Sequence, residues 1–437
     1  MIKNKKIGVI SLGCDKNRVD TEKMLAIICQ RHVLTPKIEE AEIIIINTCA
    51  FLESARKEAI EEILLASSFK QVSAEKIIVT GCLPQKFVDD MKDELLEVDA
   101  FMGVSDYADI NQVIDEIYTG KRVILVGKPR EEYITKRVLT TKDYAYLKIA
   151  DGCNNHCTYC LIPKIRGKYR SVKLTDLIEE AKGLGQVKEL ILVAQDLTKY
   201  GCDLSEKVDL VGLIQSISKL DNINSIRLMY CYPENITPCL IEEIKTNDKV
   251  LKYIDIPLQH ADDKILKLMG RKGSKAEYLS LINKLKEQIE GIAIRSTFIT
   301  GFPNEDQVAF DNLVDFIEKA QIHNAGFFKY SREEDTPAYN LKNQVEEKIK
   351  NSRLKKLYLV QKKVAVKLNK AFIGKTIKVL AEGFDQNALV YYGRSYFNAP
   401  DIDGKVYFFS KDEVERGNYY DIKITKVDGL DLYGERL

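Results

Sequence analysis

The chain has 437 residues, enough for two to four domains, which excludes a small disulfide-stapled peptide. Hydrophobic residues make up 45% and charged residues 30%, a balance typical of a globular protein and not of a membrane protein or a disordered chain. The 66 basic and 65 acidic residues give a net charge of +1, which excludes the broad attraction of a general nucleic-acid binder, while a local basic face stays possible.

The N-terminus carries lysines and then an apolar run, but that run stops at Asp15 and Lys16, too early for a secretory signal. Other apolar runs, such as 43–46, are far shorter than the ~20 residues that span a bilayer. We therefore expect a cytoplasmic protein without a membrane segment. Because the cytosol keeps thiols reduced, the ten cysteines favour metal or redox chemistry over disulfides.

Residues 1–127 alternate apolar strands with amphipathic helices, the pattern of a doubly wound parallel sheet. Three of these strands end at a cysteine, namely Cys14, Cys49 and Cys82, which we call the N-terminal triad. Their spacings are each about one strand-helix unit. Since ligands bind at the carboxyl ends of parallel strands, we expect these thiols to converge there as a metal-cluster site.

A charged stretch over residues 128–142 indicates a linker. Residues 143–370 then repeat strand and helix six times, which predicts an incomplete TIM-type barrel, open on one side. A long charged helix, at about 346–370, ends this domain. From 371 to 437, short alternating strands separated by glycines predict a small β-barrel. The expected fold class is therefore α/β with three domains.

The strongest motif is DGCNNHCTYC, at the end of the first predicted barrel strand. It places Cys153, Cys157 and Cys160, which we call the barrel triad, on one short loop. Three thiolates can hold three irons of a cubane and leave the fourth iron free for a substrate. A structural zinc site with His156 as the fourth ligand is the alternative. A structural zinc site would not explain why these cysteines lie at the catalytic face of the predicted barrel.

At these residues the chain resembles the radical S-adenosylmethionine (SAM) superfamily. The resemblance implies that the open iron binds the amino and carboxylate groups of SAM. It also implies that Tyr159 packs near the adenine, although Tyr159 could instead be a core aromatic residue. Gln195 and Asp196 end the second barrel strand and could contact the amino-acid part of SAM. The turn at Gly301 could let the backbone approach bound SAM.

Both triads and the small C-terminal barrel together resemble the methylthiotransferases over essentially the whole chain. Members of that family have an N-terminal cluster-binding domain, a radical SAM barrel and a TRAM domain. Five motifs resemble the RimO branch, which modifies an aspartate of small-subunit ribosomal protein S twelve: SLGCDKN at Ser11, IPKIRGKYRS at Ile162, LVAQD at Leu192, YIDIPLQH at Tyr253 and GRSYFNAPDIDG at Gly393. The family commonly has Gly where this chain has Asn304 and Asp335, two residue types that tolerate left-handed backbone.

The resemblance implies a radical reaction, because the β-carbon of an aspartate has no acidic proton and no leaving group. A reduced 4Fe-4S cluster on the barrel triad would cleave one SAM to the 5′-deoxyadenosyl radical, which abstracts hydrogen from the substrate. Sulfur held at a second 4Fe-4S cluster, on the N-terminal triad, would then capture the carbon radical. A second SAM would supply the methyl group. The protein would provide orientation and exclude water.

The implied partners are ribosomal protein S twelve, free or on the small subunit, an electron donor such as flavodoxin and a sulfur source. Neither a membrane nor a nucleic-acid substrate is implied. Residues 371–437 contain nine basic and eleven acidic residues, and such an acidic module suits a basic ribosomal protein better than a phosphate backbone. We expect the surface carboxylates of Asp401 and Asp403 either to contact that protein or to shape a polar turn.

Two other classes of function stay open. A tRNA adenosine methylthiotransferase like MiaB is the alternative enzyme. An iron–sulfur scaffold, or an RNA-binding protein with a structural metal, is the non-enzyme alternative, and it would need neither an open iron nor a barrel. Four further cysteines are interpreted as structural, because free cysteine packs as a small hydrophobe: Cys29, Cys202, Cys231 and Cys239.

Overall fold

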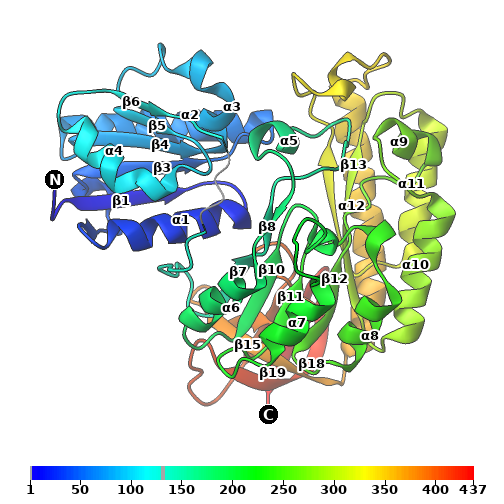
Figure 1. Cartoon of the computed structure of the whole chain (residues 1–437). Helices are drawn as coiled ribbons and strands as arrows, with labels where there is room; N and C mark the ends of the chain where they lie inside the picture. The colour runs from blue at the N-terminus through cyan, green and yellow to red at the C-terminus, as the bar shows by residue number, and fades with distance from the viewer. Residues whose placement is uncertain (1, 129–132) are drawn as a thin grey trace.

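The computed structural model describes residues 2–128 and 133–437 (Figure 1). The blue and cyan N-terminal domain lies beside the green and yellow barrel domain, and the orange and red C-terminal domain lies at one end of the barrel. The predicted linker, 128–142, falls partly on residues 129–132, which are outside the described residues. Within the described ranges, none of the helices combines the length and the apolar character that crossing a bilayer requires.

The N-terminal domain is a six-stranded parallel sheet with the strand order β2-β1-β3-β4-β5-β6. Its strand β3 carries four consecutive isoleucines, 43–46, all fully buried because helices cover both faces of the sheet. Helices α1 and α4 pack on one face, and α2 and α3 on the other. The bounds are β1 (Lys6–Ser11), α1 (Asp15–Ile28), β2 (Val33–Leu34), β3 (Ile43–Thr48), α2 (Glu53–Ser68), β4 (Lys76–Gly81), α3 (Cys82–Met91), β5 (Ala100–Met102), α4 (Ile110–Ile117) and β6 (Val123–Leu125).

The middle domain is an open parallel sheet of six strands in the order β14-β13-β12-β11-β10-β7, which confirms the predicted partial barrel. Its bounds are β7 (Tyr144–Lys148), β8 (Ala150–Asp151), α5 (Ile162–Ile165), β9 (Arg170–Ser171), α6 (Leu174–Gly183), β10 (Glu189–Val193), α7 (Leu210–Ser218), β11 (Ile226–Leu228), α8 (Pro238–Thr246), β12 (Val250–Asp255), α9 (Asp263–Leu268), α10 (Lys275–Gln288), β13 (Ala293–Thr300), α11 (Gln307–Ala320), β14 (Asn324–Lys329) and α12 (Glu347–Asn369).

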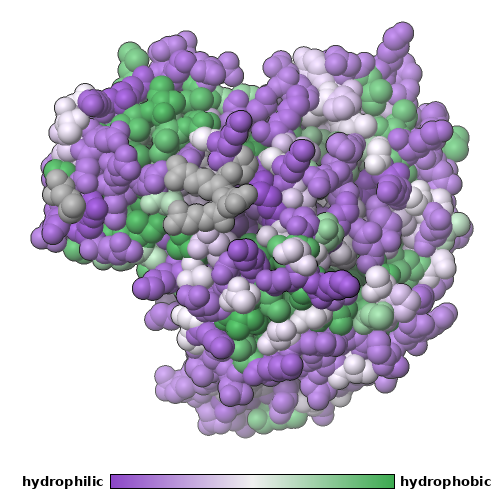
Figure 2. All heavy atoms as spheres, viewed as in Figure 1, coloured by the Kyte–Doolittle hydropathy of each residue, from purple (hydrophilic) through white to green (hydrophobic). Residues whose placement is uncertain are grey.

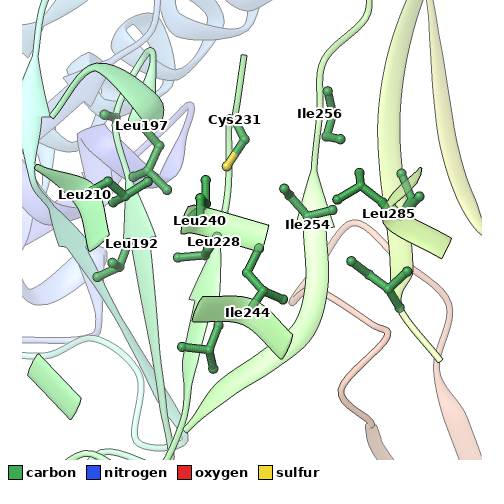
Figure 3. Close-up of a cluster of buried hydrophobic side chains, with 14 of the residues drawn as sticks. Leu192, Leu197, Leu210, Leu228, Cys231, Leu240, Ile244, Ile254, Ile256 and Leu285 are labelled. Atoms are coloured by element: carbon green, nitrogen blue, oxygen red, sulfur yellow. The ribbon is translucent and has the colours of Figure 1, made fainter. Parts of the chain in front are cut away.

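The main core of the molecule lies between these strands and the helices around them. Alternate residues of each strand point outward into it, as a strand with a period of two requires. Figure 3 shows this layer, with strand residues packed against helix residues: Leu192, Leu228 and Ile254 against Leu240, Ile244 and Leu285.

The face drawn in Figure 2 is mainly hydrophilic, with separate apolar areas over the N-terminal domain and over the lower part of the molecule.

The C-terminal domain is a closed β-barrel with the strand order β15-β16-β17-β19-β18. Closure by the pairing of β15 with β18 leaves no free sheet edge. The result confirms the small barrel predicted from the glycine-punctuated pattern. The bounds are β15 (Thr376–Asp385), β16 (Val390–Arg394), β17 (Val406–Phe409), β18 (Tyr419–Asp428) and β19 (Asp431–Arg436).

The loop between β16 and β17, residues 395–405, packs against the inner face of the middle domain. Phe397 and Ala399 of this loop are buried in one apolar cluster with Ile191, Val193 and other inward-facing residues of the barrel strands. Two barrel side chains also donate hydrogen bonds to its carbonyl groups: Arg227 to the Tyr396 oxygen at 2.8 Å and Asn324 to the Phe397 oxygen at 2.8 Å. We call residues 395–405 the plug loop.

The structure corrects the expectation for Asp403, which is not a surface carboxylate. Its side chain is 2% exposed, accepts a hydrogen bond from the Tyr253 hydroxyl at 2.8 Å and pairs with Arg295 at 3.3 Å. An acidic residue in the plug loop is buried because the barrel supplies a cation for it. Asp401 does lie on the surface, with 68% of its side chain exposed. The motif that contains both residues thus joins two domains of this chain.

The two departures from the family pattern have the backbone conformation expected of them. Asn304 has a φ of +68° and Asp335 a φ of +66°, both in the left-handed region. Asn and Asp visit that region more readily than other residues with a Cβ. The substitutions therefore leave the turns intact.

Candidate functional site

The barrel triad lies on the loop that follows β8 and precedes α5. Gly152, with a φ of +74°, begins this loop, and a Cβ there would overlap the carbonyl oxygen of Lys168. The Cys153 amide donates to the Gly167 oxygen at 3.1 Å, which fixes the loop against the chain that enters β9. Only glycine permits this close approach, so the start of the triad has one conformation.

The three thiols of the barrel triad are largely buried; two of them face backbone donors, and the Cys157 sulfur lies 3.9 Å from the Tyr232 hydroxyl. Cys153 accepts a hydrogen bond from the Asn155 amide at 3.3 Å, and Cys160 accepts one from the Ile162 amide at 3.4 Å. Burial raises the pKa of Cys153, and it raises the pKa of Cys160 to about 12. Amide donors stabilise thiolates once iron replaces the proton, so this donor set fits an iron–sulfur cluster.

Asp196, a predicted SAM contact, holds the barrel triad loop in place. Its fully buried carboxylate accepts hydrogen bonds from the Asn155 side chain at 2.9 Å and from the Thr198 hydroxyl at 2.6 Å. Lys199 lies 3.8 Å away and balances its charge. Because both carboxylate oxygens already have partners and Asn155 sits within the triad loop, Asp196 positions that loop.

The side chain of Gln195, the residue before Asp196, has one oxygen atom without a hydrogen-bond partner among the described residues. Its amide nitrogen donates to Asp151 at 3.1 Å, whereas this oxygen, Oε1, is buried. Asp151 lies two residues before the barrel triad. A buried acceptor without a partner is costly unless a bound group satisfies it, so Gln195 fits a ligand that carries N–H donors.

Tyr159 and Gly301 have contacts within the protein. Tyr159 packs edge-on against Phe302, with 6.5 Å between the ring centroids, on a small apolar cluster that is separate from the main core. Gly301 has a φ of +75°, and its amide donates to Glu305 at 2.8 Å. A Cβ on Gly301 would overlap Lys350 of α12. A structural reason thus exists for both residues, and their contact with SAM stays a prediction.

The N-terminal triad comes from the ends of β1, β3 and β4, which are neighbours in the sheet. Gly13 has a φ of +91°, and a Cβ there would lie 2.8 Å from the Cys49 Cβ and 3.3 Å from its sulfur. Glycine thus lets the segment before Cys14 approach Cys49. Cys14 is exposed, Cys49 half-buried and Cys82 buried. Burial raises the pKa of Cys49, and it raises the pKa of Cys82 to about 12.

Both triads are therefore assembled as sets of three thiols on neighbouring backbone. Within residues 2–128 and 133–437, no three His, Cys, Asp or Glu side chains surround the position of a single metal ion. A cubane cluster differs in that each thiolate binds a separate iron. His156, the fourth ligand of the zinc alternative, is exposed.

Arg166, a residue that the sequence did not single out, contacts the N-terminal triad at Cys82 and the barrel domain at Asp151. It belongs to the motif IPKIRGKYRS and is 2% exposed. Its guanidinium donates to Asn17, Asp20 and Asp151 at 2.6, 3.1 and 2.9 Å, and it lies 3.8 Å from the Cys82 sulfur. Burial opposes the charge, but the carboxylates of Asp151 and Asp20 outweigh it and hold the pKa of Arg166 well above its usual value.

A second buried ionic network joins the same two domains farther along α1. Lys23 pairs with Glu180 at 3.0 Å, and Arg137 pairs with Glu180 at 2.7 Å and with Glu22 at 2.8 Å. All four side chains are at most 3% exposed. Buried charges require their partners in place, so these pairs define how the N-terminal domain sits on the barrel.

A cavity of about 340 Å³ is bounded by all three domains beside Cys14. Its walls include Tyr146 and Tyr230 of the middle domain and Asp401 of the plug loop. Arg18, one helical turn after Cys14, also lines it and donates to the Tyr144 hydroxyl at 2.9 Å, which in turn donates to Asp401 at 3.0 Å. A substrate group that enters this cavity therefore reaches the N-terminal triad.

Three family models match the chain in the order of its domains. They are described as uncharacterized protein family UPF0004 at residues 6–103, the radical SAM superfamily at 147–317 and the TRAM domain at 373–437.

The chain is similar over its full length to proteins named ribosomal protein uS12 methylthiotransferase RimO. The protein of Acetivibrio thermocellus is 45% identical, with 99% of this chain and 98% of that protein covered. The protein of Clostridium kluyveri is 47% identical, with 98% of this chain and 97% of that protein covered.

Solved structures show a similar fold at low sequence identity. The radical SAM methyltransferase TsrM of Kitasatospora setae gives a TM-score of 0.58 at 11% identity, and the match covers 77% of each chain. The cobalamin-dependent SAM radical enzyme OxsB gives a TM-score of 0.52 at 11% identity, over 82% of this chain and 56% of that one. At this identity the likeness concerns the fold alone.

Proposed function

This chain belongs to the RimO family of ribosomal protein uS12 methylthiotransferases, and we propose that it inserts sulfur and a methyl group at the β-carbon of an aspartate in small-subunit ribosomal protein uS12. One observation carries the proposal. One buried arginine contacts Cys82 of the N-terminal triad and Asp151, two residues before the barrel triad, in a chain that is similar to RimO proteins from end to end. The tRNA alternative is not favoured, because the full-length relatives carry the RimO name.

The enzyme uses two SAM molecules per turnover and two 4Fe-4S clusters, one on each triad. When bound, these groups supply the electron that cleaves SAM, the resulting 5′-deoxyadenosyl radical, and the sulfur and methyl group that are transferred. Cys153, Cys157 and Cys160 would hold the cluster that binds and cleaves SAM. The buried Oε1 atom of Gln195 would accept a hydrogen bond from an N–H group of SAM, and Asp196 holds the loop through Asn155.

Tyr159 and Gly301 complete the proposed SAM site. The Tyr159 ring, packed on Phe302, offers an apolar surface to the adenine. The turn at Gly301 holds Glu305 and lets α12 approach the barrel closely.

The substrate aspartate enters the cavity beside Cys14. Its walls carry Tyr146, Met229 and Tyr230, whose apolar surfaces exclude water from a radical. The plug loop forms another wall of this cavity, so the TRAM domain contributes residues to the proposed reaction site. Deleting residues 371–437 would uncover the inner face of the barrel. Point variants are therefore the better probes of this domain.

The reaction also requires an electron donor such as flavodoxin and a sulfur source. The substrate is uS12, free or on the small subunit, and nucleic acid is not required as a substrate. We place the reaction in the cytoplasm, where the ribosome is found.

Mass spectrometry tests the proposed function. Anaerobically reconstituted enzyme, SAM and a reductant are incubated with uS12 and, separately, with unmodified tRNA. We expect a methylthio group on one aspartate of uS12 and none on tRNA, and a Cys153→Ala variant is the inactive control. Methylthiolation of a tRNA adenosine with uS12 unchanged would establish the alternative enzyme. Absence of 5′-deoxyadenosine in every reaction would establish the non-enzyme alternative.

A further inference from the structure

Arg166 contacts Cys82 of the N-terminal triad and Asp151, the residue two positions before the barrel triad. On the N-terminal side, its guanidinium donates to Asn17 and Asp20 of α1 and lies 3.8 Å from the Cys82 sulfur. On the barrel side, it donates to both oxygens of Asp151, at 3.2 and 2.9 Å. Asp151 lies two residues before the barrel triad. One rigid, planar group thus joins side chains of α1 to the side chain of Asp151.

Arg166 belongs to a network of charged side chains next to Cys82. Lys148 also contacts Asp20 and pairs with Asp151 at 3.1 Å, so two cations face two carboxylates in a buried space. Iron binds cysteine as the thiolate, so the Cys82 sulfur would be a ligand atom beside this network. Arg166 is the cation that contacts the Cys82 sulfur, and burial weakens the screening between them.

A cation and an N–H donor at a ligand sulfur favour the reduced state of an iron–sulfur cluster. Net charge, hydrogen bonds to sulfur and solvent exposure set the reduction potential of such clusters. Cys82 has the first two from Arg166, and it is 6% exposed. Cys14 is exposed, so its sulfur interacts with solvent as well. The buried Cys82 sulfur is thus surrounded by protein charges, whereas the Cys14 sulfur is partly surrounded by solvent.

We propose that Arg166 is a positioning residue that couples the two triads: it raises the reduction potential of the N-terminal cluster and holds that cluster in register with the barrel triad. The inference rests on the proposed function only in assuming that each triad holds a cluster. Arg166 need not touch SAM or the substrate. Its effect on the potential is electrostatic, and its effect on register comes from pairing with Asp20 and Asp151.

The potential is measured where the N-terminal cluster is the only one present. Full-length protein with Cys153→Ala, Cys157→Ala and Cys160→Ala is reconstituted, its iron is counted, and its midpoint potential is determined by a titration followed by electron paramagnetic resonance. We expect Arg166→Gln to shift the potential to a lower value at equal iron content. An unchanged potential in Arg166→Gln overturns the proposal.

Arg137→Gln is the matched control. It removes a buried cation from the second network between the same two domains, but its contacts are Glu22, Glu180 and the Tyr146 oxygen, and none is a cysteine. We expect the potential of this variant to equal that of the parent protein. An equal downward shift in Arg137→Gln and Arg166→Gln would mean that loosening the interface is sufficient, and it overturns the electrostatic role.

Arg166→Lys keeps the test decisive if Arg166→Gln does not take up iron. A lysine ammonium lacks the planar fork and cannot pair with Asp20 and Asp151 while donating to Cys82. We expect a smaller downward shift of the potential, and a potential equal to that of the parent overturns the proposal. None of these measurements uses uS12, so an error in the assigned substrate would leave their outcome unchanged.

The role of Arg166 in holding the two clusters at a fixed relative position is tested in the enzyme with both triads intact. We expect Arg166→Lys to form less methylthiolated uS12 for each 5′-deoxyadenosine than the unaltered enzyme. A ratio equal to that of the unaltered enzyme would overturn the positional part of the proposal.

Discussion

The barrel triad spans eight residues of a single loop, 153–160, whereas the N-terminal triad is assembled at the ends of three strands, at residues 14, 49 and 82. Local backbone and one buried carboxylate, Asp196, hold the first. The second depends on the order of β1, β3 and β4 and on docking of the N-terminal domain against Arg166. A local site therefore depends on its own turn, and a dispersed site depends on the whole domain.

The largest expected effect separates the two triads by chemistry. Replacing Cys153, Cys157 and Cys160 with Ala should remove about half of the roughly eight irons that two cubanes contain and should abolish 5′-deoxyadenosine formation. The reason is that the barrel triad is the set to which SAM cleavage is assigned. Iron analysis and chromatography of the nucleoside measure both outcomes. Retention of all the iron would contradict the two-cluster interpretation.

The reciprocal variant removes the dispersed triad. Replacing Cys14, Cys49 and Cys82 with Ala should also remove about half of the iron, but the reduced protein should still form 5′-deoxyadenosine because the barrel loop is independent. No sulfur should be attached to uS12, as mass spectrometry would show. Methylthiolation by a folded form of this variant would mean that the N-terminal triad has been misinterpreted.

Replacing the glycine before each triad with alanine tests how strongly the local backbone conformation depends on that glycine. Gly152→Ala should lower the free energy of unfolding by about 3 to 5 kcal/mol, because a left-handed residue is strained and its Cβ would overlap a backbone oxygen. Gly13→Ala should lower it by about 2 to 3 kcal/mol, since the residue is also left-handed but its Cβ would lie 2.8 Å from the Cys49 Cβ, a less severe overlap than at Gly152. Urea unfolding and iron content measure both variants.

Gly120→Ala is the control for this pair. Gly120 has a φ of +84°, but a Cβ there would have no neighbour within 4 Å. The substitution should therefore lower the free energy of unfolding by about 1 kcal/mol, from backbone strain alone, without loss of iron. An effect in Gly120→Ala as large as that in Gly152→Ala would contradict the steric explanation.

The smallest expected effect concerns the support of the barrel loop. Asp196→Asn keeps the shape but weakens the bonds to Asn155 and Thr198, so the iron affinity of the barrel triad should fall by about 1 to 3 kcal/mol. Chelator competition measures it. Asp209→Asn, which alters the N-cap of α7, is the control and should leave iron binding unchanged. Loss of SAM binding with iron affinity intact would instead favour Asp196 as a direct SAM contact.

The sequence by itself determined the α/β class, the six-stranded open barrel, the closed C-terminal barrel and the residues of both triads. Each of these follows from a repeat along the chain: strand and helix lengths place Cys14, Cys49 and Cys82 at successive strand ends, and close spacing places Cys153 and Cys157 on one loop. The left-handed turns at 304 and 335 were also predictable, because residue type constrains φ locally.

Only the tertiary structure decided the roles of Arg166, the plug loop and Asp403. A charged residue in a turn has the same local pattern whether it faces water or a cation of another domain, so the burial of Asp403 against Arg295 could not be predicted. Arg166 meets Asp20 and Asp151, which lie 146 and 15 residues away in the chain, because two domains dock around it. Contacts of that kind depend on how whole domains pack, and no periodicity within either domain encodes them.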